Sequence, residues 1–203
     1  MFILLESSDM KRKPTNIITK VRTGNGDFGL TTVGSCQLNK SDPVVKALAQ
    51  LQVCQAAVGA WTHDLEAPYS NAVRLCRDIL YEIGAGINMM MDDRTDKERL
   101  EKLERLYDSR QEALEAAMSD VLGDGLSLSG FIMADAHSAV GALSTAFVRQ
   151  LECDMVSMGG LRYGSFDLAY SIRTLVNIMS DLLFVVDVRT REGEQEYWEG
   201  LGF

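Results

Sequence analysis

The placement of proline is the feature that most constrains how this 203-residue chain can fold. All three prolines, Pro14, Pro43 and Pro68, lie in the first third of the chain. Proline inside a helix removes a backbone hydrogen bond and clashes with the preceding turn, so the other two thirds can form long, uninterrupted helices. A chain of this length forms one domain with a substantial core and is short for two.

Apolar residues recur at three- and four-residue steps in five segments after residue 42, which is the spacing of a buried helix face. Ser41-Asp42-Pro43 opens the first segment with a capping residue and a proline at the first helical position. The fourth segment is unusually apolar, which suits a central helix packed on several sides. No alternating strand pattern is present, so we predict an all-α five-helix bundle with a four-helix core. The expected helices cover about residues 43–61, 69–91, 98–118, 131–156 and 166–188.

Composition divides the chain into three parts of one domain. Residues 1–42 are rich in Gly, Thr and Asn and lack a helical period, so we expect a loop-rich N-terminal segment. Residues 43–190 form the predicted helical bundle, and residues 191–203 form a polar C-terminal tail.

Charge and cysteine usage exclude several classes of protein. A net charge of −9 argues against non-specific nucleic-acid binding, which depends on basic residues at the phosphates. No run reaches the roughly 18 apolar residues of a membrane span, and no signal sequence is present, so we expect a cytoplasmic protein without membrane contact. The four cysteines and two histidines lack metal-ligand spacing, so no metal site is expected and the thiols should be reduced.

A glycine-rich motif in the N-terminal segment has the composition of an anion-binding loop. Residues 24–29 read GNGDFG, but the dinucleotide fingerprint of this spacing requires a strand before it and a helix after it. Glycines still allow successive backbone amides to surround an anion. Thr23, Thr31 and Thr32 add hydroxyl groups, and Lys40 adds positive charge. The motif therefore predicts a phosphate-binding loop, with a flexible glycine-rich arm as the alternative.

Six segments, met in order along the chain, have the patterns of one known family. Ile-Thr-Lys and GDFGLTT within residues 18–32 and Lys-Ser-Asp at residues 40–42 are followed by four shorter helical patterns. The set resembles motifs of the propanediol-utilisation (PduO) type of ATP:cob(I)alamin adenosyltransferase, including its TKTGDxGxTS loop. The four later patterns, which resemble LFxIGA, LExxID, FILPGG and NRLSDLLF, lie at residues 79–85, 103–108, 131–133 and 177–184.

The resemblance implies a fold, an assembly and a reaction. It implies a five-helix protomer in a homotrimer, with nucleotide sites made by the N-terminal loop of one chain and helices of its neighbour. It implies transfer of the adenosyl group of ATP to cob(I)alamin, with magnesium and release of triphosphate. Asp27 would orient the loop or a metal-bound water, because its charge repels phosphate. The nucleotide-binding residues expected on this basis are Thr23, Gly26, Asp27, Gly29, Thr31, Thr32 and Lys40, with Arg149 and Asn177 across the interface.

Several departures from the family pattern remove charged groups. Leu-Gln-Val-Cys-Gln at residues 51–55 replaces an acidic VDELN segment, and residues 134–136 replace a PGG turn. The family's fourth helix carries several arginines, and an ungapped match places Phe147, Leu151 and Glu152 at three of them. A shift of two residues recovers Arg149 but leaves Gln150 and Cys153 at other arginine positions. Either register loses most of the positive charge that would stabilise a leaving triphosphate.

Three functions follow from these observations. The first is a non-catalytic protein that binds ATP or another nucleotide at the subunit interfaces. The second is a divergent adenosyltransferase, in which case cobalamin also binds. The third is a structural or interaction protein that retains only the bundle. No catalytic residue is assigned from the sequence.

Overall fold

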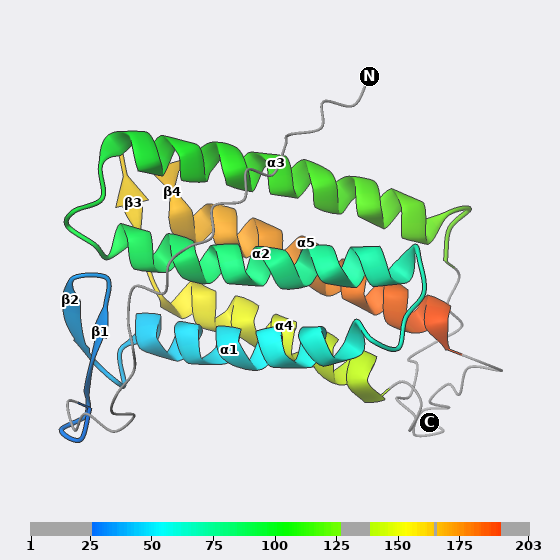
Figure 1. Ribbon diagram of the computed structural model, residues 1–203, viewed down its shortest axis with the longest axis horizontal. Coiled ribbons are helices and arrows are strands. Elements are labelled where there is room, and N and C mark those ends of the chain that lie inside the picture. Colours follow the sequence, from blue (N-terminus) through cyan, green and yellow to red (C-terminus); the bar gives the residue numbers. More distant parts are fainter. Residues whose placement is uncertain (1–25, 127–138, 165, 192–203) are drawn as a thin grey trace, which may run out of the picture.

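The computed structural model describes residues 26–126, 139–164 and 166–191. Five helices form a bundle in which successive helices run in opposite directions, which confirms the predicted all-α fold class (Figure 1). The helices are α1 (Pro43–Trp61), α2 (Tyr69–Met90), α3 (Lys97–Leu122), α4 (Ala139–Ser157) and α5 (Leu168–Thr190). None of the helices in these ranges is both long and apolar enough to cross a membrane.

The helix ends follow local sequence signals. The Asp42 side chain caps α1 by accepting a hydrogen bond from the Val44 amide at 2.9 Å, and Pro43 occupies the first turn. Asp96 caps α3 in the same way, and Asp167 caps α5. Each capping side chain satisfies one of the amides that the first helical turn leaves without a partner. These interactions explain why the observed starts of α1 and α3 lie close to the predicted ones.

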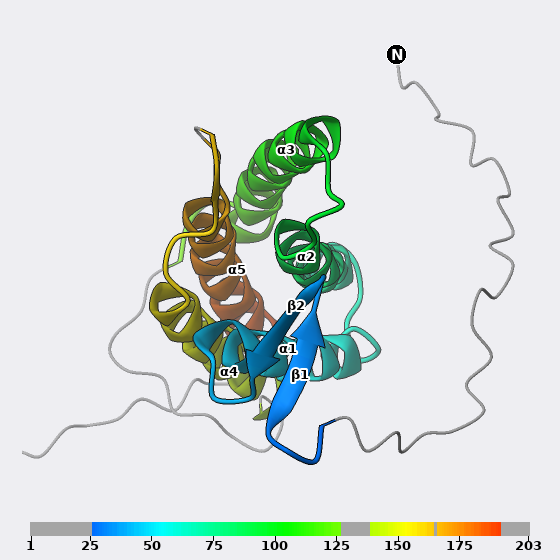
Figure 2. The same ribbon diagram turned by 90° about the vertical axis from the view of Figure 1, so that its left-hand side faces the viewer.

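Two short antiparallel hairpins are present where no strands were expected. The first pairs β1 (Leu30–Val33) with β2 (Cys36–Asn39), so that Leu30 lies opposite Asn39. It stands at the end of the bundle where α1 begins and α2 ends (Figures 1 and 2). The second pairs β3 (Arg162–Tyr163) with β4 (Phe166–Asp167), and α5 begins directly after it. The predicted start of the fifth helix, Phe166, is therefore in a strand.

The centre of the bundle is α5, which packs against α2, α3 and α4. Thirteen of its residues are buried, including Ile172, Met179 and Val186. The apolar composition of the fourth helix predicted that this helix would be central, and the prediction was wrong. α4 packs against α1 and α5, but its outward side is exposed, with Leu143 at 52% and Val156 at 58% of their maximum accessibility. The predicted first turns of this helix, from Phe131, lie outside the described residues.

Candidate functional site

Residues 26–29 of the glycine-rich motif form a closed turn at the open end of the first hairpin. The Gly29 amide donates to the Gly26 carbonyl at 3.2 Å, and the Lys40 amide donates to the Gly29 carbonyl at 2.8 Å. The Lys40 ammonium also donates to the Gly26 carbonyl at 2.7 Å. Gly29 has a φ of +76°, a conformation that residues with a Cβ rarely adopt. The turn therefore holds a positive charge at the surface next to backbone that can approach a ligand closely.

Thr31 and Thr32 follow this turn on β1 and line a pocket of about 410 Å³, here called the hairpin pocket. Its walls come from β1, α1 and α2. The apolar part is formed by aliphatic side chains such as Val45 and Leu48. The polar lining beyond the two threonines consists of three amide side chains, from Gln52, Gln55 and Asn88.

The hairpin is fixed to the end of α2 through its own turn. The Ser35 amide donates to the Met91 carbonyl at 3.0 Å, and the Gly34 amide donates to Asn88 Oδ1 at 3.4 Å. The Cys36 thiol donates to the same Met91 carbonyl. Gly34 has a φ of +59°, and a Cβ there would lie 2.4 Å from the Met91 backbone. This contact sets the position of β1 and therefore the shape of the hairpin pocket.

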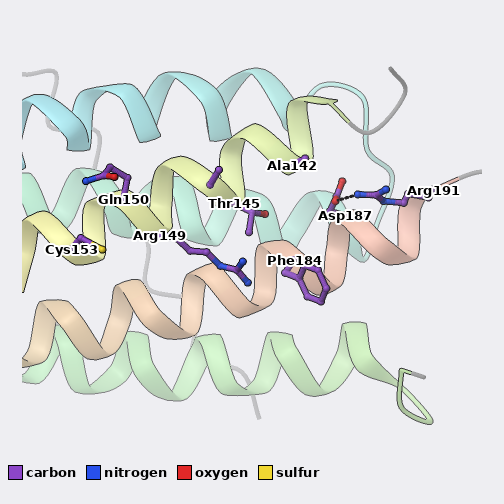
Figure 3. Close-up of a pocket in the computed structure, with 9 residues that line it drawn as sticks. Ala142, Thr145, Arg149, Gln150, Cys153, Phe184, Asp187 and Arg191 are labelled. Atoms are coloured by element: carbon purple, nitrogen blue, oxygen red, sulfur yellow. Dashed lines mark hydrogen bonds and ion pairs between the residues drawn. The ribbon is translucent and has the colours of Figure 1, made fainter. Parts of the chain in front are cut away.

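Arg149 lies in a second pocket of about 440 Å³, here called the helix pocket, on the outward side of α4 and α5 (Figure 3). Its guanidinium carbon lies 5.8 Å from the centre of the Phe184 ring, within the range of a cation–π contact. The small side chains of Ala142, Thr145 and Ala146 also line this pocket, and Arg149 is exposed to solvent. The pocket therefore offers one planar cation beside an aromatic ring.

The net charge of the helix pocket is set by Arg149. Asp187 and Arg191 both line the pocket, but they form a buried ion pair with an N–O distance of 2.5 Å. Their charges offset one another. Arg149 forms no salt bridge with another residue in the described ranges, so its charge is available to an anion.

The structure places the predicted site residues in separate groups. Gly26, Gly29 and Lys40 meet at the turn, and Thr31 and Thr32 lie in the adjacent hairpin pocket. Asp27 is exposed in the turn and lines neither pocket. Thr23 lies outside the described residues.

The two residues expected across the interface both lie on the α4–α5 side. Asn177 is exposed on α5 and precedes Phe184 by seven residues, which places it on the same helix face about 10 Å away. It is not part of the helix-pocket lining. None of the described residues lines both pockets.

Several pocket residues were not predicted from the sequence. Gln52 and Gln55 lie in the segment that replaces the family's VDELN, but they were not predicted to form a hydrogen-bonding surface. Their spacing of three residues, which places both on one face of α1, was the available signal. Phe184 and Asp187 had no such signal, because their roles depend on how α4 packs against α5.

Metal-ligating clusters are not found in the parts of the chain that the structure describes, where no three His, Cys, Asp or Glu side chains gather. His63 is exposed just beyond the end of α1, and His137 lies outside the described residues.

Thiol reactivity should distinguish the four cysteines. Burial raises the pKa of Cys54 to about 12 and raises the pKa of Cys76 as well, so both remain protonated at pH 8. Cys153 is exposed in the helix pocket. Because the thiolate is the nucleophile, we expect iodoacetamide to alkylate Cys153 readily in the native protein and to leave Cys54 and Cys76 unmodified. Peptide mass spectrometry would measure this, and rapid modification of Cys76 would contradict the described packing.

Comparison with known proteins gives one family and several similar structures. A family model described as cobalamin adenosyltransferase matches residues 21–189. No curated protein matches the chain.

Three of the similar solved structures are variants of the PduO-type ATP:corrinoid adenosyltransferase from Lactobacillus reuteri. One, complexed with cobalamin and ATP, has a TM-score of 0.66 and 18% identity, covering 89% of this chain and 100% of that one. A second with the same ligands has a TM-score of 0.63 and 19% identity, covering 84% of this chain and 90% of that one. A third, complexed with ATP, has a TM-score of 0.59 and 18% identity, covering 82% of this chain and 91% of that one. At these identities the likeness shows a shared fold.

Proposed function

This chain belongs to the cobalamin adenosyltransferase family, and from that premise we propose that it binds a nucleotide between the subunits of a homotrimer without transferring an adenosyl group. The glycine turn and Lys40 of one chain would face the helix pocket of its neighbour, with Arg149 and Asn177 contributing from that side. ATP is the first candidate ligand, and other nucleotides are the alternatives.

The separation of the two half-sites is the observation that favours a shared site. The hairpin pocket is lined by β1, α1 and α2, whereas the helix pocket is lined by α4 and α5. Neither half has the charge and enclosure of a complete nucleotide site. In a ring of identical subunits, each interface joins two different patches of the same chain. Such an interface can bring a turn with Lys40 against a pocket with Arg149.

The outward surfaces of α1 and α4 support assembly. Residues 47–62 on α1 contain no charged side chain, and residues 139–148 on α4 contain none either. Several apolar residues there are exposed, including Val53 at 41%, Val140 at 39% and Leu143 at 52%. Depletion of charged residues is characteristic of the buried centre of contacts between proteins.

The charge of the two pockets favours binding over catalysis. Transfer from ATP requires stabilisation of a triphosphate leaving group, and removing one such electrostatic contact typically costs on the order of 100-fold in rate. Arg149 is the one arginine of the helix pocket whose charge is not offset by a described carboxylate. Magnesium, which prefers oxygen ligands and is often bound through substrate phosphates, would arrive with the nucleotide.

Calorimetric titration of ATP with magnesium tests the proposal. We expect binding in the micromolar range with one nucleotide per chain, and sedimentation equilibrium should give the mass of a trimer. ATP should also slow the alkylation of Cys153, because that thiol lines the helix pocket. Absence of binding by ATP and by a panel of other nucleotides would contradict the proposal and favour a purely structural bundle.

Family membership favours a second candidate function, a working adenosyltransferase with cob(I)alamin as the acceptor substrate. The glycine turn and Lys40 are retained in this chain. Mixing the protein with ATP and chemically reduced cobalamin would give the visible spectrum of adenosylcobalamin if this function is present. We expect no such spectrum, and turnover that depends on Arg149 and Asn177 would replace the binding proposal.

A further inference from the structure

The lining of the hairpin pocket is polar but uncharged. Five residues with polar side chains, Thr31, Thr32, Gln52, Gln55 and Asn88, line a space of about 410 Å³. Among the residues that the structure describes, the lining contains no Lys, Arg, Asp or Glu. A phosphate placed there would lose its hydration without gaining a counter-charge, which is strongly unfavourable. The pocket therefore selects for an uncharged group.

Part of this polar lining is already used by the fold. The side-chain Nδ2 of Asn88 donates to the Gly84 carbonyl at 2.8 Å, and its Oδ1 accepts from the backbone amide of Gly34. The Gln55 amide donates to the Leu80 carbonyl at 3.1 Å. In contrast, the side chains of Thr31, Thr32 and Gln52 form no hydrogen bond with any other described residue. These three groups are available to a ligand.

The remaining walls are apolar. Val45, Leu48 and Leu51 contribute aliphatic surface, and Gly84 lacks a side chain that would narrow the space. A Cβ at Gly84 would lie 3.0 Å from Leu51 Cδ2. Sites for small ligands commonly combine an apolar surface with a few polar groups that set orientation. A planar heterocycle would meet the aliphatic wall with its face and the polar groups with its edge.

We infer that the hairpin pocket binds the nucleobase of the ligand, with Gln52 at its hydrogen-bonding edge. A glutamine side chain presents a donor and an acceptor side by side, which matches the adjacent donor and acceptor of adenine. The phosphates would then extend towards the glycine turn, which precedes β1, and towards Lys40, which follows β2 and donates to the Gly26 carbonyl. This inference rests on the proposed nucleotide function. It adds that much of the binding energy comes from the base, so that a nucleoside binds well without phosphates.

Calorimetric titrations with adenosine and with ATP test this assignment in the full-length protein. We expect adenosine to bind within about tenfold of the affinity of ATP. Gln52→Leu should weaken both ligands by about 5- to 150-fold, the range expected for loss of a bidentate contact to a base of 1–3 kcal/mol. Thr32→Val provides a second variant of nearly unchanged shape and should weaken both ligands as well.

Gln37→Leu is the matched control, because Gln37 is an exposed glutamine on β2 that does not line the pocket. It should leave both affinities unchanged. If ATP binds but adenosine does not, or if Gln52→Leu and Thr32→Val behave like the control, the base assignment is wrong while the nucleotide function stands. If neither ligand binds to the unmodified protein, the proposed function fails and the base assignment fails with it.

Discussion

Replacing Gly34 with alanine should detach the β1–β2 hairpin from the end of α2. The new Cβ would lie 2.4 Å from both the carbonyl carbon and oxygen of Met91 and 2.7 Å from the Asn88 carbonyl. These are backbone atoms, so they cannot move aside as a flexible side chain can. The φ of +59° adds about 1–2 kcal/mol of strain for a residue with a Cβ. The hairpin should move rather than α2, because α2 is held by the core.

Gly34→Ala should greatly reduce nucleotide affinity and change the helical content little. We expect nucleotide affinity to fall by more than about tenfold, since Thr31 and Thr32 would leave the hairpin pocket. Helical content measured by circular dichroism should remain near that of the unmodified protein, while the hairpin amides should exchange faster with solvent. Gly123→Ala is the control, because Gly123 also has a positive φ, +55°, but a Cβ there would meet nothing within 4 Å. Unchanged nucleotide affinity in Gly34→Ala would show that the position of the hairpin does not affect nucleotide binding.

Arg149→Ala should reduce the affinity for ATP by about tenfold to a hundredfold, because a hydrogen bond to a charged group contributes about 1.5–3 kcal/mol. The same change should leave adenosine binding nearly unaltered, since the arginine would face phosphates. Arg149 is exposed, and its described contact is with the Phe184 ring, so the free energy of unfolding should change little. Isothermal calorimetry with the two ligands measures the difference.

Two further variants sharpen this comparison. Arg149→Lys keeps the charge but loses the planar fork and its stacking on Phe184, so ATP affinity should be intermediate. Arg105→Ala removes an exposed arginine from α3, an element that lines neither pocket, and should have no effect. Equal loss of adenosine and ATP binding in Arg149→Ala would indicate that Arg149 supports the fold of the site instead of contacting phosphate.

The helical part of the fold was predictable because its signals are local. The Asp42-Pro43 start and the apolar spacing of α1 are written within one segment, and the structure confirms the helix over Pro43–Trp61. The hairpins were missed because four-residue strands such as Leu30–Val33 are too short to show alternation. The first hairpin also depends on a contact with Met91, which is distant in the sequence.

The site was predictable only in part, for a related reason. Glycine, threonine and lysine near the N-terminus pointed to the turn, but the opposing amides of the hairpin pocket lie on α1 and α2. Composition also gave the wrong position for α4. An apolar sequence is compatible both with a helix in the core and with a helix that has an exposed apolar face. Leu143 is apolar but half-exposed, and only the packed structure distinguishes these two cases.

Mixing two defective variants tests most directly whether the nucleotide site is shared between subunits. Lys40→Met damages the turn half-site, and Arg149→Ala damages the helix half-site, so each variant alone should bind ATP weakly. When the two are co-expressed and assemble at random, about one quarter of the interfaces in a cyclic trimer should combine an intact turn with an intact helix pocket. We expect calorimetry to recover about that fraction of sites with unmodified affinity. Mixed assemblies with no recovered sites would contradict a site formed by two chains.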